Sequence, residues 1–182
     1  MKAILTTALA ASLAAGSAFA AGFTGDTVDG AYHFPDTSTV VLDGGGAVAP
    51  TSFFFSTGLP NTTATVGATQ ITLSFDAGGG TFNPASFSGV VITDLTEADI
   101  TGVTLDPSTS VPGFTASDLS FTSDSVSLNL QGLGVPSAND IVVADVSFGG
   151  VPEPASWALM LLGVGAVGGA LRLSRRRDAV TA

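Results

Sequence analysis

The chain has 182 residues, no cysteine, fifteen acidic residues and only five basic ones, giving a formal net charge of −10 at pH 7. The basic residues all lie near the termini (Lys2, Arg172, Arg175, Arg176 and Arg177), whereas thirteen of the fifteen acids and the single histidine, His33, lie between residues 21 and 150. This composition excludes disulfides and thiolate metal sites, and it argues against nucleic acid, phosphate or carboxylate ligands, which are bound mainly through Lys and Arg.

The first 20 residues have the pattern of a secretory signal peptide. Lys2 precedes an apolar run from Ala3 to Ala15, and Ala18 and Ala20 are the small residues of a cleavage site. We therefore predict that residues 1–20 are removed and that Ala21 begins the exported domain. The alternative is a retained N-terminal membrane helix, which so short and alanine-rich a run does not favour.

Residues 21–150 are predicted to form one domain of short β-strands. Three segments alternate apolar and polar residues with the period of a half-buried strand: Gln70–Asp76, Ser125–Gln131 and Asp140–Gly149. The last segment changes phase near Ala144, which predicts a bulge. Other runs rich in Thr, Ser and Val are Thr39–Leu42, Ser52–Phe55, Val90–Thr93, Ile100–Leu105 and Asp118–Thr122. About eight to ten such strands predict an all-β fold, an antiparallel β-sandwich.

Two further local patterns occur in this domain. Leu95–Gly102 suggests a helical turn, with Thr96 as its N-cap. Gly44–Phe53 and Gly78–Phe87 both read GGG-x-x-x-P-x-S-F. This repetition indicates either a duplicated strand–loop–strand unit or a chance similarity in a chain rich in glycine and serine.

The domain offers few residues for catalysis, and its best candidates for ion binding are acidic. His33 is the only histidine, and a lone histidine in a strand-like segment is more typical of a structural or surface residue. Calcium takes six to eight oxygen ligands, so Asp94, Glu97 and Asp99 are candidate ligands, as are Asp26 and Asp29. The alternative is a solvated acidic surface. We therefore expect no cofactor, with calcium at these carboxylates as the one possibility to test.

The C-terminal segment is predicted to enter a membrane. Pro154–Leu171 contains no charged residue, and its length as a helix, roughly 27 Å, is enough to cross a bilayer core. Trp157 lies near its outer end, and Arg172, Arg175, Arg176 and Arg177 follow as a stop-transfer cluster that remains in the cytoplasm. A buried core helix is the alternative, which the glycines of this segment disfavour in water.

The tail from about residue 151 to residue 177 resembles the PEP-CTERM sorting signal of Gram-negative bacteria, in its PEPxxWA variant. Pro152, Glu153 and Pro154 are followed by Trp157 and Ala158, an apolar glycine-rich span and the arginine cluster. The resemblance implies recognition of Pro152–Pro154 by exosortase, a membrane transpeptidase, with cleavage close to this motif. Residues 151–182 are thus expected to be a sorting signal that holds the protein in the inner membrane until processing.

From these observations we expect an exported, non-enzymatic protein that is held with its β-domain on the periplasmic side and is then moved to the cell surface or released. The resemblance implies a structural role in the cell envelope or in an extracellular, exopolysaccharide-containing biofilm matrix. Extracellular polysaccharide is an expected partner and nucleic acid is not. The alternative is an adhesion module that binds carbohydrate or calcium and carries the same sorting tail.

Overall fold

The computed structural model describes residues 21–58, 60–97, 99–149 and 161–166. Residues 161–166 are helical, and Ala20–Gly150 form one compact unit, referred to below as the β-domain. Its elements are β1 (Thr27–His33), β2 (Val40–Val48), β3 (Thr51–Phe55), β4 (Thr62–Val66), β5 (Gln70–Phe75), β6 (Gly80–Thr81), β7 (Gly89–Asp94), β8 (Ile100–Leu105), the 3₁₀ helix η1 (Ala116–Asp118), β9 (Leu119–Phe121), β10 (Ser125–Asn129), β11 (Gly134–Val135) and β12 (Ile141–Phe148). The prediction of an all-β fold is therefore confirmed.

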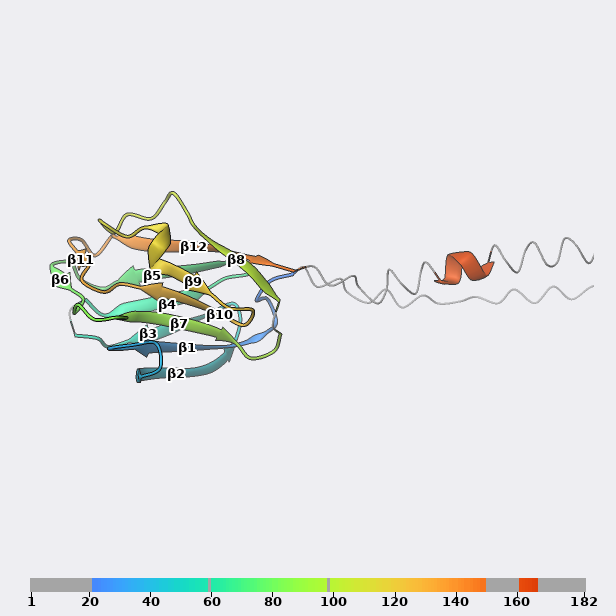
Figure 1. Ribbon diagram of the computed structural model, residues 1–182, viewed down its shortest axis with the longest axis horizontal. Coiled ribbons are helices and arrows are strands. Elements are labelled where there is room, and N and C mark those ends of the chain that lie inside the picture. Colours follow the sequence, from blue (N-terminus) through green and yellow to red (C-terminus); the bar gives the residue numbers. More distant parts are fainter. Residues whose placement is uncertain (1–20, 59, 98, 150–160, 167–182) are drawn as a thin grey trace, which may run out of the picture. The chain divides into compact units, whose positions relative to one another are not determined.

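Ten of these strands form two five-stranded sheets whose apolar faces share one core (Figure 1). The strand orders are β2-β1-β7-β10-β9 and β3-β4-β5-β12-β8, and β6 pairs with β11 in a small separate sheet. All neighbouring strands run antiparallel. The arrangement is the sandwich that the short, regularly spaced strands predict, with two additional two-residue strands, β6 and β11, that no sequence pattern indicated.

The core is built from alternate residues because successive side chains of a strand point to opposite faces of its sheet. In β5 the inward residues are Ile71, Leu73 and Phe75, and in β10 they are Val126 and Leu128; all five are at most 5% exposed. These are the residues that the alternation in Gln70–Asp76 and Ser125–Gln131 predicts. The period of two was therefore sufficient to assign the buried face of these two central strands.

Two local predictions, a bulge near Ala144 and a helical turn in Leu95–Gly102, are wrong, and the two GGG segments prove to differ. Strand β12 keeps a single phase, with Val142, Ala144 and Val146 all in the core, and its irregularity lies between Ser147 and Phe148 rather than near Ala144. Among the described residues of Leu95–Gly102 there is no helical turn, because Asp94 accepts the local N–H groups in a side-chain turn. The two GGG segments also differ, since Gly44–Gly46 lie inside β2 whereas Gly78 and Gly79 precede β6.

Two strands of the five-stranded sheets, β1 and β4, were also missed. In β1, Asp29 and Gly30 interrupt the apolar pattern, and Gly30 is required because a Cβ there would lie 2.4 Å from the ring of Phe53. In β4, threonines occupy both faces, and Thr62 is fully buried. Neither segment therefore shows the alternating apolar and polar pattern by which a half-buried strand is recognised in a sequence.

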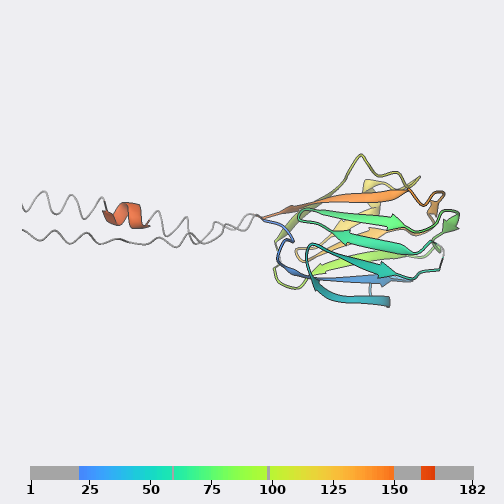
Figure 2. The ribbon, with the colours of Figure 1, turned by 180° about the vertical axis from the view of Figure 1, so that it is seen from behind.

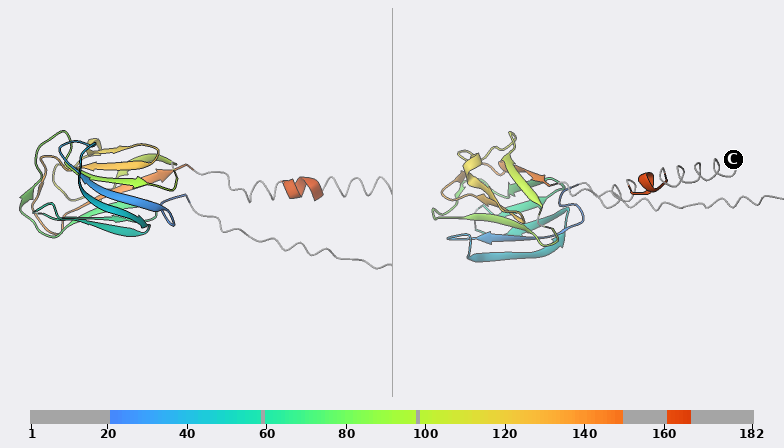
Figure 3. Two further views of the ribbon diagram at one scale, coloured as in Figure 1. Left: turned by 90° about the horizontal axis from the view of Figure 1, so that it is seen from below. Right: turned by 45° about the vertical axis from the view of Figure 1, so that its right-hand side comes forward.

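The chain enters and leaves the β-domain at the same end. The ring of Phe23 packs edge-on against Phe148, with centroids 4.8 Å apart, and the N–H of Gly149 donates to the carbonyl of Asp99 at 2.7 Å. The small β6–β11 sheet lies at the opposite end of the sandwich (Figures 1, 2 and 3). A segment that follows Gly149 therefore begins far from the β6–β11 end.

Candidate functional site

The residues predicted to direct export and sorting lie almost entirely outside the described residues. These are Ala18 and Ala20 of the cleavage site, the motif Pro152, Glu153, Pro154 and Trp157, and the cluster Arg172, Arg175, Arg176 and Arg177. Ala21 is the first described residue and is exposed. Of the membrane helix predicted over 154–171, residues 161–166 are described and helical; within the described ranges no helix is both long and apolar enough to cross a membrane.

The predicted calcium ligands lie beside one another between the end of β7 and the start of β8. Asp94 is 4% exposed, and its Oδ1 accepts N–H groups from Thr96 at 2.8 Å and Glu97 at 3.2 Å, while its Oδ2 is buried without a hydrogen-bond partner. Burial raises the pKa of Asp99, and the neighbouring carboxylate of Asp94 raises it further. The structure thus brings together residues that the sequence suggested. One oxygen of the Asp94 carboxylate, Oδ1, already accepts two N–H groups of the loop.

A fourth acid, Asp26, joins this acidic cluster from the segment before β1. Burial raises the pKa of Asp26, and the carboxylates of Asp94, Glu97 and Asp99 raise it further. The sequence had paired Asp26 with Asp29 instead. In the part of the chain that the structure describes, no three carboxylate or histidine side chains are arranged to hold a metal ion, so calcium at Asp94, Glu97 and Asp99 stays a prediction.

His33, at the end of β1, lies against an aromatic side chain. Its ring meets Phe87 edge-on with centroids 6.4 Å apart, and its Nδ1 is buried without a hydrogen-bond partner. Among the described residues, His33 Nδ1 therefore has a packing environment and no hydroxyl that it could activate as a nucleophile.

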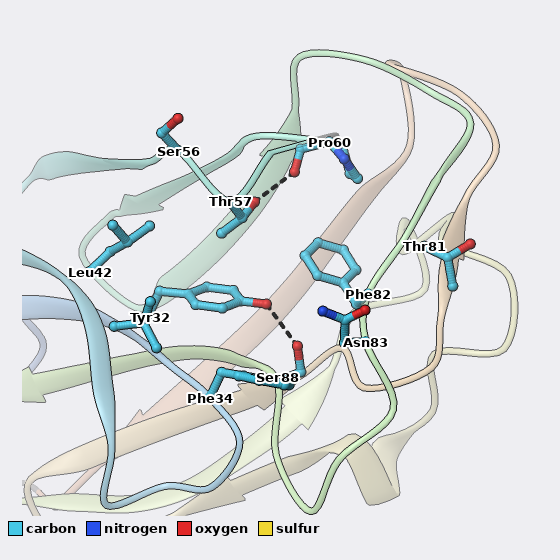
Figure 4. Close-up of a pocket in the computed structure, with 11 residues that line it drawn as sticks. Tyr32, Phe34, Leu42, Ser56, Thr57, Pro60, Thr81, Phe82, Asn83 and Ser88 are labelled. Carbon is cyan, nitrogen blue, oxygen red and sulfur yellow. Dashed lines mark hydrogen bonds between the residues drawn. The ribbon is translucent and has the colours of Figure 1, made fainter.

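A pocket with a volume of about 240 Å³ opens at the β6–β11 end of the domain (Figure 4). Its floor is formed by two buried rings, Tyr32 and Phe82, which lie with centroids 6.4 Å apart and planes inclined by 28°. The Tyr32 hydroxyl and the Ser88 hydroxyl are hydrogen-bonded at 2.8 Å, and the Ser88 N–H donates to Oδ1 of Asn129 at 3.1 Å. These contacts hold the floor in place before any ligand binds.

The rim of the pocket is more exposed and mostly polar, with Val41 as an exposed apolar member. Ser56, Thr81 and Asn83 are exposed side chains from two separate segments of the chain, the β3–β4 connection and the stretch at the end of β6. The Thr57 hydroxyl donates to the carbonyl of Pro60 at 2.7 Å, which ties the β3–β4 connection together at the pocket's edge. Among the described residues that line the pocket, Tyr32 carries the one ionisable group. Burial raises the pKa of Tyr32, which keeps its phenol neutral.

The sequence reasoning missed this pocket. Tyr32 is the only tyrosine of the chain and directly precedes His33, the residue of that stretch with evident catalytic chemistry. Phe82 and Asn83 belong to the second GGG stretch, which was considered only as a repeat. An aromatic residue next to a neutral amide was the one available signal, but such pairs are too common to nominate a site.

Comparison with known proteins identifies the C-terminal segment. Residues 150–177 match the family model described as the PEP-CTERM protein-sorting motif. No curated protein and no protein of known structure matches the chain significantly. The resemblance of the tail to a PEP-CTERM signal is therefore confirmed, and the motif supports export, membrane-associated sorting and processing by exosortase.

Proposed function

We propose that the protein is a non-enzymatic structural component of the cell envelope or of an extracellular polysaccharide matrix such as a biofilm. The PEP-CTERM motif at residues 150–177 carries this proposal. It begins directly after the last strand of the β-domain, which ends at Phe148. Delivery of a folded β-domain to the cell exterior is therefore the purpose of the tail.

The route begins with removal of residues 1–20 after Ala20. The segment 154–171 then holds the protein in the inner membrane, with Arg172 and Arg175–Arg177 in the cytoplasm and the β-domain on the periplasmic side. Exosortase recognises Pro152–Pro154, where two prolines favour an extended backbone without secondary structure. Processing releases the β-domain for the cell surface or the extracellular space.

The non-enzymatic role is supported by the residues available for chemistry. The region between residues 21 and 150 has no cysteine, lysine or arginine, and its one histidine packs against Phe87. Thirteen acids with no basic partner give this region a strong negative charge, which keeps such domains apart and soluble. A neutral matrix polymer is compatible with this surface, whereas an anionic one is repelled.

The second candidate is an adhesion module, and the pocket favours its carbohydrate form. Its lining of rings, hydroxyls, an amide and the aliphatic side chains of Val41, Leu42 and Pro60 carries no formal charge at neutral pH. The calcium form rests only on the acidic cluster of Asp26, Asp94, Glu97 and Asp99.

The sorting proposal is tested by replacing Pro152, Glu153 and Pro154 with alanine in the native host. We expect the wild-type protein to lose its tail and to fractionate with the envelope or the matrix, and the triple variant to retain its tail and accumulate in the inner membrane. Intact-mass measurement of each fraction detects the difference. A matched control replaces Pro107 and Glu97, both exposed on the β-domain, and should be processed like wild type.

Two results would contradict the proposal. Equal processing of the triple variant and the control would show that Pro152–Pro154 are not the recognition element. Correct processing together with absence of the protein from both envelope and matrix fractions would remove the structural role while leaving the sorting signal intact.

A further inference from the structure

We propose that the pocket at the β6–β11 end is a binding site for a single neutral sugar ring of a polysaccharide. The inference takes its extracellular setting from the proposed function and adds a site and a class of ligand. It is carried by the geometry around Tyr32, Phe82 and Asn83.

The floor of the pocket matches the apolar side of a sugar ring. Tyr32 and Phe82 are 6% and 5% exposed, so they offer a small apolar surface rather than a wide groove. Further buried rings lie close to them, since the centroid of Phe75 is 6.0 Å from that of Phe82 and the centroid of Phe55 is 6.3 Å from that of Tyr32. A ligand that settles on this floor meets a rigid surface and orders few side chains, which favours affinity.

The rim matches the hydroxyl groups of the same ring. Ser56, Thr81 and Asn83 provide both hydrogen-bond donors and acceptors, and all three are exposed to solvent. Asn83 lines the same pocket as Tyr32 and Ser88, whose hydroxyls are hydrogen-bonded to each other (Figure 4). An amphipathic ligand with one apolar face and a polar circumference satisfies both parts at once.

Charge and size restrict the ligand further. No cationic side chain exists between residues 21 and 150, so phosphate, sulfate and carboxylate groups find no partner and meet a negative surface. No carboxylate lines the pocket to pair with an amine. A volume of about 240 Å³ is below the roughly 300–1,000 Å³ of sites for drug-sized ligands, which fits one sugar ring.

The position of the pocket suits a long polymer. It opens at the β6–β11 end, whereas Phe23 and Gly149 lie at the other end of the sandwich. A β-domain held through the segment after Gly149 therefore presents the pocket away from its attachment point. A sugar ring within a long polysaccharide can therefore enter the pocket while the rest of the polymer stays clear of the end of the β-domain at which Phe23 and Gly149 lie.

The single tyrosine of the chain allows a direct test. Full-length protein labelled with ¹³C-tyrosine and purified in detergent micelles gives ring signals from Tyr32 alone. We titrate it with the methyl glycosides of glucose, galactose and mannose, and with glucuronate as an anionic control. The expected result is a saturable shift of the Tyr32 signals with at least one neutral glycoside and none with glucuronate.

Three variants separate the pocket from the rest of the domain. Asn83→Ala removes an exposed rim amide and should weaken binding about 3- to 10-fold, the effect of one hydrogen bond. Asn139→Ala, at an exposed asparagine that does not line the pocket, should bind like wild type. Ser56→Trp should fill the opening and abolish binding, while an unchanged melting temperature shows that the fold is intact.

The proposal is overturned if no neutral glycoside shifts the Tyr32 signals, if glucuronate shifts them equally, or if Asn83→Ala and Asn139→Ala bind alike. These outcomes are independent of sorting because the assay uses unprocessed, purified protein. A failure here leaves the processing experiment unaffected, and failure of processing leaves the pocket unaffected.

Discussion

Replacing Gly89 with alanine tests the close contact between β7 and β10. Gly89 begins β7 and lies opposite His33 of β1 and Asn129 of β10. A Cβ at this position would lie 2.0 Å from the carbonyl oxygen of Leu128, whereas ordinary contacts begin at 3.4 Å. The obstacle is backbone, so β10 must retreat by more than an ångström rather than turn a side chain aside.

The expected cost follows from what that movement disturbs. Inserting a methyl group into a packed region costs about 1–3 kcal/mol, and this site is near the upper end because no rotamer change relieves it. The hydrogen bonds from Leu130 N–H to the carbonyl of Ser88 and from Ser88 N–H to Asn129 Oδ1 lie beside it, each worth about 1 kcal/mol. We therefore expect Gly89→Ala to lose about 3 kcal/mol of unfolding free energy, or about 10 °C in Tm for a domain of this size.

Gly102 provides the matched control. It also lies in a strand, β8, but its Cβ would meet only the Ser147 side chain, at 3.7 Å. Gly102→Ala should therefore stay within about 1 kcal/mol of wild type, with a small gain from reduced backbone entropy. Urea unfolding followed by circular dichroism measures both variants. If Gly89→Ala is as stable as Gly102→Ala, the contact between β7 and β10 is not as described.

Two further predictions concern the end of the domain where the chain enters and leaves. The pKa values of Asp26 and Asp99 are raised in the folded state, so their negative charge opposes folding above the folded pKa, and this penalty vanishes below the ordinary value of 3.8. Asp26→Asn and Asp99→Asn should therefore each raise Tm at pH 7 by a few degrees, as surface changes of about 0.5 kcal/mol do. Melting at pH 3 should show no gain for either variant. Equal gains at both pH values would refute the electrostatic origin. Phe23→Ala should cost about 3–5 kcal/mol, because Phe23 is fully buried against Phe148; urea unfolding with a loss below 1 kcal/mol would show that the contact is dispensable.

Local patterns predicted the fold class because strand periodicity is a property of neighbouring residues. Ile71, Leu73 and Phe75 alternate on one face whatever the rest of the chain does. The same argument failed for β1, where Gly30 is required because the ring of Phe53, from another strand, occupies the space of a Cβ. A residue whose type is set by a contact with a distant strand gives no periodic pattern within its own segment.

The acidic cluster likewise combines features that the sequence predicts with features that only the fold decides. Asp94, Glu97 and Asp99 are close in sequence, so their proximity could be anticipated. Asp26 joins them because β1 and β7 are paired, with Val28 opposite Asp94. That pairing, and the turn in which Asp94 Oδ1 accepts two N–H groups, could not be predicted from the segment alone.

The sequence by itself determined that this protein carries a PEP-CTERM sorting signal, because Pro152–Pro154, the apolar segment and the arginines are contiguous and are matched as a linear motif. It also determined the all-β class and the absence of cationic side chains from residues 21–150. Only the tertiary structure decided that Tyr32, Ser56 and Phe82 surround one pocket. These residues come from β1, from the β3–β4 connection and from the chain just after β6, which belong to or follow strands of three different sheets. Packing between the sheets, which no local pattern encodes, places them together.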